Sequence, residues 1–113
     1  MRDYQLHVFK VPVKTTEDWR FKEKCLLRAA QIISEPYLNK ARNYMVAVAH
    51  KISVDPPNAE PRISLVITGA DTMELIVRVP VNSGGKGRIE QAILRLYLEY
   101  LESPEKLTES EQD

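Results

Sequence analysis

The sequence has few of the residues from which metal sites and covalent catalytic sites are built. Cys25 is its only cysteine, so one chain can form neither an internal disulfide nor a cysteine-rich metal site. The two histidines, His7 and His50, stand far apart, and neither has a second ligand at helical i+4 spacing. No nucleophile elbow, metalloprotease motif or pair of carboxylates framed by turns is present. We therefore expect no catalytic residue, no metal, no cofactor and no enzyme activity.

Long apolar runs and an excess of one charge are also missing. No segment approaches the ~18 apolar residues of a bilayer-spanning helix, and the N-terminus lacks the apolar stretch of a signal peptide. Sixteen basic residues balance sixteen acidic ones. Residues 102–113 carry five acids and one lysine, which leaves a net charge of +4 on the rest of the chain. That excess is too small for the dense basic face of a nucleic-acid-binding protein, so we expect a soluble chain with no nucleic-acid partner.

The composition is that of an ordinary globular chain. It is 113 residues long, with 43% apolar and 28% charged residues, which suits one domain with a single core. We expect this α/β domain to occupy residues 1–101. Residues 102–113 are acidic and lack apolar periodicity, so we expect them to form a disordered tail.

The chain begins with a strand followed by a helix start. Residues 4–13 are rich in β-branched and aromatic side chains and predict a strand, with Pro12 marking its end. Thr15 and Asp18 have the spacing of a capping box, which predicts a helix from this point. Trp19 opens that helix, and we expect its indole to be largely buried against the sheet.

Pro36 predicts a break in the helical pattern, because proline lacks an N–H and disfavours helical geometry in the residue before it. A second helix is expected directly after it, since apolar residues again recur every three or four positions. This stripe is interpreted as a buried face that packs on the sheet or on a neighbouring subunit. Its members are Leu38, Ala41, Met45, Val48 and Ile52.

The second half of the chain predicts a β-hairpin and a closing helix. Residues 62–68 and 73–81 alternate apolar and polar side chains around a short turn at 69–72, which is typical of a hairpin. An amphipathic pattern then predicts a helix over residues 89–101. The predicted order β-α-α-β-β-α is that of an α+β, ferredoxin-like sandwich, with an antiparallel-rich sheet, helices on one face and the last strand missing.

The missing strand leaves one side of the first strand, Tyr4–Val13, without a partner. Its free N–H and C=O groups would form a template for another strand. We expect this edge either to self-associate or to be covered by the tail or a loop of the same chain.

The stretch from Pro80 to Ile93 contains a glycine-rich turn before the last helix, which raises the possibility of a phosphate-binding loop. A phosphate loop needs Ser or Thr directly after its lysine, whereas Lys86 is followed by Gly87 and Arg88. The turn is therefore interpreted as a corner of the chain. Lys86 and Arg88 stay candidates for holding a small anion, since basic residues oppose the dipole of a helix start; pairing with Glu90 or plain solvation are the alternatives.

Several of these segments together resemble the cytoplasmic C-terminal α/β domain of the small-conductance mechanosensitive channel family. In that family a strand ending in Val-Pro-Val precedes a Thr-x-x-Asp-Trp helix start, and a Pro-Arg hairpin later leads through a basic loop into an Ile-x-x-x-Ile-Leu helix. The resemblance covers nearly all of residues 4–101. The matching segments here are Val11 to Val13, Thr15 to Trp19, Pro61-Arg62, Glu74 to Arg78, and Ile89 to Leu94.

The resemblance implies a chain that forms part of the wall of the chamber below a channel pore. It implies a homo-oligomer that forms through the parent channel. It also implies a position on the cytoplasmic side of the membrane, with membrane contact only through segments absent from this chain. The loop at 84–88 would then have no nucleotide role. The chain is then either a segment of such a channel or a free-standing relative. The alternative function is a ferredoxin-like regulatory module that binds a small anion at Lys86 and Arg88, or a partner protein.

Overall fold

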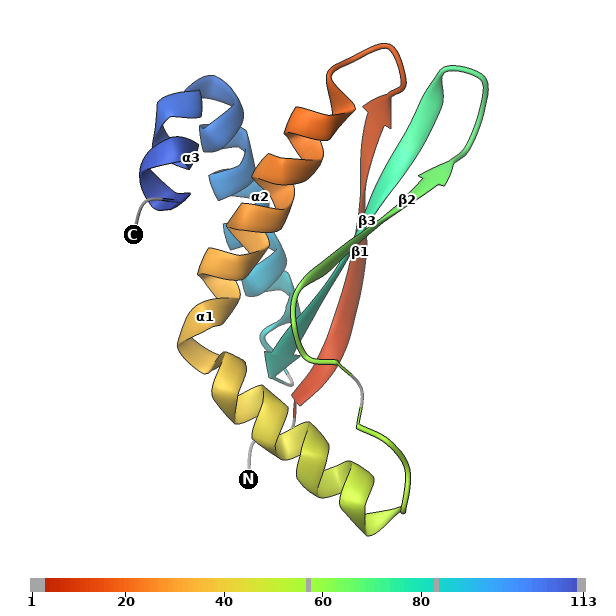
Figure 1. The fold of residues 1–113 in the computed structure, drawn as a ribbon, viewed down its shortest axis with the longest axis vertical. Helices are drawn as coiled ribbons and strands as arrows, with labels where there is room; N and C mark the ends of the chain where they lie inside the picture. The colour runs from red at the N-terminus through yellow and green to blue at the C-terminus, as the bar shows by residue number, and fades with distance from the viewer. Residues whose placement is uncertain (1–3, 57, 83, 112–113) are drawn as a thin grey trace.

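The computed structural model describes residues 4–56, 58–82 and 84–111. Within them the chain has an α+β architecture in which a three-stranded antiparallel sheet carries all three helices on one face (Figure 1). The strand order is β1-β3-β2, so β3 is central. The elements follow the order β1 (Tyr4–Lys14), α1 (Trp19–Lys51), β2 (Arg62–Ile67), β3 (Thr72–Asn82), α2 (Lys86–Glu102) and α3 (Pro104–Glu111).

The core lies between the sheet and the helices. Alternation along β3 puts five side chains on the covered face, each at most 2% exposed, and the predicted β2–β3 hairpin is confirmed by its antiparallel register. β1 adds its odd-numbered apolar residues, and α1 and α2 close the core from above. The residues of these elements that form the core cluster are Phe9, Val11, Val13, Cys25, Leu26, Ala29, Ala30, Met73, Leu75, Val77, Val79, Val81, Ile93, Tyr97 and Tyr100.

The predicted break at Pro36 is wrong, because α1 is a single helix of 33 residues that contains this proline. Pro36 is solvent-exposed, so its ring meets only the preceding turn of its own helix. Buried residues occur on both sides of it, from Ala30 and Ser34 to Ala41. The two halves thus share one packed face, and this tertiary packing outweighs the local cost of the proline.

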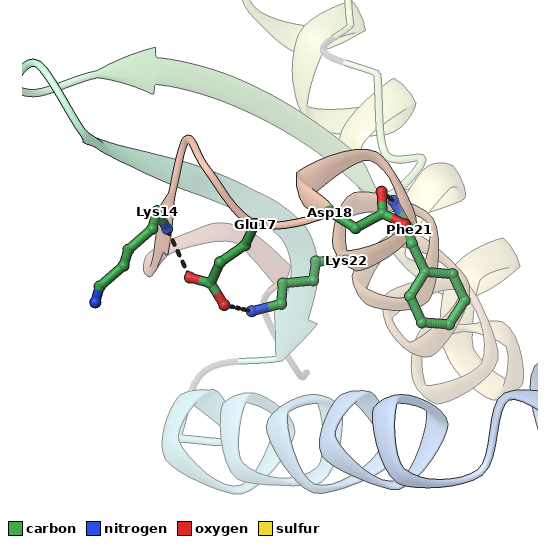
Figure 2. A network of polar contacts seen from close by, with 5 residues as sticks. All are labelled: Lys14, Glu17, Asp18, Phe21 and Lys22. Atoms are coloured by element: carbon green, nitrogen blue, oxygen red, sulfur yellow. Dashed lines mark hydrogen bonds and ion pairs between the residues drawn. The ribbon is translucent and has the colours of Figure 1, made fainter.

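The start of α1 also differs from the predicted capping box (Figure 2). Asp18 is the N-cap, and its carboxylate accepts a hydrogen bond of 3.3 Å from the backbone N–H of Phe21. Thr15 takes no part in this cap. Glu17 accepts a hydrogen bond of 3.0 Å from the backbone N–H of Lys14 and pairs with the Lys22 ammonium. The bond from Lys22, and then that from Lys14, lowers the pKa of the Glu17 carboxyl below its usual value.

Trp19 is half-buried, which is less than the sequence predicts. It packs against the edge of the core, and the guanidinium of Arg20 lies 4.8 Å from the centre of its ring. As the first residue of α1, it sits where the helix has only begun to cross the sheet. The position at the helix start therefore limits how much of the indole the core covers.

The expectation of a disordered tail is wrong for most of its length, because residues 104–111 form α3. Leu107 is 3% exposed and joins the core. The Arg28 guanidinium donates to the Ser110 hydroxyl at 3.2 Å and to the Ser110 carbonyl at 2.5 Å. Ion pairs of Lys24 with Glu111 and of Lys106 with Glu99 also join α3 to α1 and α2. These scattered contacts do not show as sequence periodicity.

The apolar stripe in the second half of α1 is buried only in part. Ala41 and Met45 are buried, whereas Val48 is 38% and Ile52 63% exposed. This end of α1 extends past the sheet (Figure 1). The exposed part of the stripe therefore lies where no strand of the described chain covers it.

Candidate functional site

The glycine-rich turn places Lys86 and Arg88 in the first turn of α2. Gly84 has a φ of +89°, a conformation that glycine adopts without strain, and the Gly85 N–H donates to the Asn82 carbonyl at 3.0 Å. Lys86 and Arg88 are exposed, and neither has a hydrogen-bond or ion-pair partner within residues 4–56, 58–82 and 84–111. The turn places both charges at a helix start, where two residues at i and i+2 spacing point in different directions.

Glu90 is the ion-pair partner that the sequence suggests for these cations, but it pairs with His7 instead. The His7 Nε2 atom lies 2.9 Å from Glu90 Oε1. An ionised carboxylate only accepts hydrogen bonds, so the imidazole donates. The pair joins β1 to the first turns of α2, on the face of the sheet that the helices cover.

The residues that carry reactive chemistry elsewhere are scattered or buried here. No group of three or more His, Cys, Asp or Glu residues is placed to hold a metal ion in the described part of the chain. Cys25 is fully buried in the core, and burial raises the pKa of its thiol. In that state the sulfur is a core atom rather than a nucleophile.

The open edge of β1 can be read from the register and from two prolines. Pro80, which has no N–H, lies opposite Leu6, and this pair cannot be one that exchanges backbone hydrogen bonds. Even-numbered β1 residues therefore point their N–H and C=O groups away from β3. The Lys14 N–H, which donates to Glu17 rather than to β3, agrees with this direction.

The outer edge of β1 consequently has free N–H groups in its first half, whereas its second half offers none. Leu6, Val8 and Lys10 present N–H groups outward, and β3 is the one strand that pairs with β1 within the described residues. Pro12 presents none, and Glu17 takes the N–H of Lys14. A further strand could therefore pair only with the first half of β1.

An apolar groove lies beside this open half. It has a volume of about 330 Å³ and runs between the start of β1 and the exposed end of the α1 stripe. The side chains along it include Tyr4 and Leu6 on one side and Val48 and Ile52 on the other. A strand added to β1 would find an apolar wall there for its side chains.

Two functional candidates that the sequence interpretation missed are Arg62 and Arg78, which lie directly opposite each other on β2 and β3. Both project from the face of the sheet that carries no helix, since the odd-numbered β3 residues fill the covered face. The hairpin alternation would have placed them together, had the register across the 69–72 turn been counted residue by residue.

Comparison of the chain with family models, curated proteins and solved structures finds no match. None of the helices in the described ranges combines the length and apolarity needed to cross a membrane. The candidate sites are thus three surfaces described by their geometry alone. They are the basic turn at α2, the open half of the β1 edge with its groove, and the helix-free face of the sheet with its two arginines.

Proposed function

We propose that this chain is the cytoplasmic C-terminal α/β domain of a small-conductance mechanosensitive channel. Its role is to form part of the wall of the chamber below the pore and part of the contact between subunits, without chemistry of its own. The observation that carries the proposal is the strand order β1-β3-β2 with every described helix on one face. We infer from it a ferredoxin-like sandwich whose fourth strand, beside β1, is missing.

The placement of the resembling segments supports the same proposal. Val11 to Val13 falls near the end of β1, and the Thr15 to Trp19 segment leads into α1. Pro61-Arg62 opens β2, Glu74 to Arg78 lies inside β3, and Ile89 to Leu94 lies in α2. Each segment thus lies in or next to an element of the type that the resemblance implies, which favours the proposal without testing the family itself.

The uncovered surfaces favour a subunit within an assembly over an isolated domain. The open half of β1, the groove beside it and the exposed end of α1 together offer apolar side chains and free backbone groups. Unpaired strand edges of this kind are usually covered in natural proteins. In a homo-oligomer, a neighbouring subunit or another part of the parent channel would cover them.

A second candidate is a free-standing ferredoxin-like module that binds a small anion at Lys86 and Arg88. The observation in its favour is that both side chains are exposed and lack partners among the described residues, at the N-terminus of a helix without a side-chain cap. Titration calorimetry with phosphate and with magnesium-ATP separates the two: saturable micromolar heat that Lys86→Ala abolishes would favour the module.

A chimaera tests the main proposal. The membrane part of a small-conductance mechanosensitive channel is joined to this chain in place of its own C-terminal domain, and cells without their own mechanosensitive channels are subjected to osmotic downshock. We expect the chimaera to restore survival, and a control with Leu75→Asp, which breaks the core, to fail. A chimaera that reaches the membrane and folds but gives no protection would contradict the proposal.

A further inference from the structure

Two like charges stand side by side on the helix-free face of the sheet. Arg62 and Arg78 are cross-strand partners in the β2–β3 register. The Thr68 N–H donates to the Thr72 carbonyl in the same register, so Arg62 and Arg78 belong to the pairs that exchange backbone bonds, with Cα atoms about 5.5 Å apart. Like charges in this arrangement destabilise a sheet.

Neither arginine has an acidic partner within the described residues. The Arg78 Nε is buried and makes no hydrogen bond. Glu74, the acid on the same face of β3, lies 4.0 Å from Lys10 instead. A buried guanidinium nitrogen without an acceptor is costly. Glu23 of α1 lines a pocket together with Arg62 but forms no ion pair with it, so the charge of both arginines is unpaired within the described residues.

The same chain carries a matching pair of carboxylates elsewhere. Glu105 and Glu109 are exposed and stand four residues apart on α3. Lys106, the cation between them, forms its ion pair with Glu99 instead. Side chains at this spacing lie on one face of a helix with Cβ atoms about 5–6 Å apart. The spacing of the two acids therefore equals that of the two arginines.

Within one molecule the two pairs stay apart. α3 lies against α1 and α2, and the helix layer separates it from the open face of the sheet (Figure 1). The charge distribution of the chain follows the same division, because residues 102–113 hold an acidic excess and the remainder a basic one. No ion pair to Arg62 or Arg78 is formed within the described residues, so a second molecule can supply the complementary charge.

We propose that the open sheet face of one copy binds α3 of the next copy, with Arg62 and Arg78 facing Glu105 and Glu109. The inference rests on the proposed homo-oligomer and names the two surfaces that meet in it. Val8 and Val66, which are 51% and 42% exposed on the same sheet face, would be covered by the incoming helix. Because the two surfaces differ, the contact is head-to-tail and leads to a ring or a helical chain of subunits.

Sedimentation equilibrium of the whole chain, at low and high NaCl, tests this contact. We expect association that weakens with salt, because exposed charge pairs are screened. Arg62→Glu with Arg78→Glu should weaken it at least about tenfold, and Glu105→Lys with Glu109→Lys should do the same. The fourfold variant keeps the net charge of the natural chain and should regain both the affinity and the salt dependence. Circular dichroism verifies that each variant is folded. If a charge reversal unfolds the chain, the neutral substitutions Arg62→Gln and Glu109→Gln are measured in its place.

Each result decides the matter. Recovery in the fourfold variant supports the proposed contact. Association that neither reversal changes would overturn it and leave a homo-oligomer built through another surface. A monomer up to millimolar concentration would overturn it too, whereas the channel proposal is judged separately by the osmotic downshock of the chimaera.

Discussion

His7 on β1 and Glu90 on α2 form a half-buried pair, with 2.9 Å between His7 Nε2 and Glu90 Oε1. It is a direct polar link between β1 and α2. Removing either partner leaves the other at a partly buried position without its hydrogen bond. His7→Ala and Glu90→Ala should therefore each lower the free energy of unfolding by about 1–2 kcal/mol.

A double-mutant cycle in urea measures the link itself. The doubly substituted chain should lose less than the sum of the single losses, with a coupling energy of about 1 kcal/mol. Glu90→Gln, which retains an acceptor oxygen without the charge, should keep part of the stability. Additive losses would show that the two side chains do not interact in solution.

Substitution of Pro36 is predicted to raise the free energy of unfolding rather than to lower it. Its ring is exposed inside α1, so Pro36→Ala restores a helical N–H without changing the core. We expect the free energy of unfolding to rise by roughly 2 kcal/mol, since proline costs about 3 kcal/mol in a helix interior and alanine loses more chain entropy on folding.

Pro104 provides the matched control for this substitution. It is the first residue of α3, where proline is well tolerated, so Pro104→Ala should be close to neutral. A Pro36→Ala chain that is less stable than the natural one would mean that the proline sets the direction of the second half of α1.

Leu107 is predicted to hold α3 in place. Its side chain is buried, so Leu107→Ala should remove about 2–3 kcal/mol from the stability of α3 against the other helices. Amide hydrogen exchange should then show faster exchange over residues 104–111. Leu98→Ala, at a side chain that is 53% exposed, is the control and should change exchange little. Equal exchange in the natural and Leu107→Ala chains would indicate that α3 is not docked.

These examples show why parts of the fold could be predicted from the sequence and others could not. The hairpin sequence alternates with period two over both strands, and the burial of β3 side chains follows this period from Met73 to Val79. The passage of α1 through Pro36 depends on packing beyond the proline, and α3 depends on contacts with Arg28, far away in the sequence. Local patterns carry no information about such distant partners.

The same limit applies to the candidate surfaces. Lys86 and Arg88 could be singled out because charge at a helix start is a local feature. Arg62 and Arg78 matter only as a cross-strand pair, and the direction of the β1 edge follows from Leu6 facing Pro80. Both depend on register, which is a property of two strands together.

The β1 edge should show its alternation in amide exchange at low concentration. The Phe9 and Val11 N–H groups point to β3 and should be protected, whereas those of Leu6, Val8 and Lys10 should exchange fast. If another strand covers the edge, as the sequence predicts for self-association, the outward amides should become protected as concentration rises.

Lys10→Pro is the probe for this edge, since it removes an outward N–H and leaves the β1–β3 bonds intact, as Pro12 does in the natural chain. It should prevent the added protection at Leu6 and Val8 while Phe9 and Val11 stay protected. Fast exchange of the outward amides at every concentration would show an edge that only water covers.

The proposed function is that of a domain of a mechanosensitive channel. Patch-clamp recording on the product of the complete reading frame that contains it, in membranes free of other such channels, tests that claim most directly. We expect currents of small conductance that appear on suction and disappear when tension is released. A reading frame without apolar membrane spans, or a membrane-inserted product that passes no current up to the tension that ruptures the patch, would contradict it.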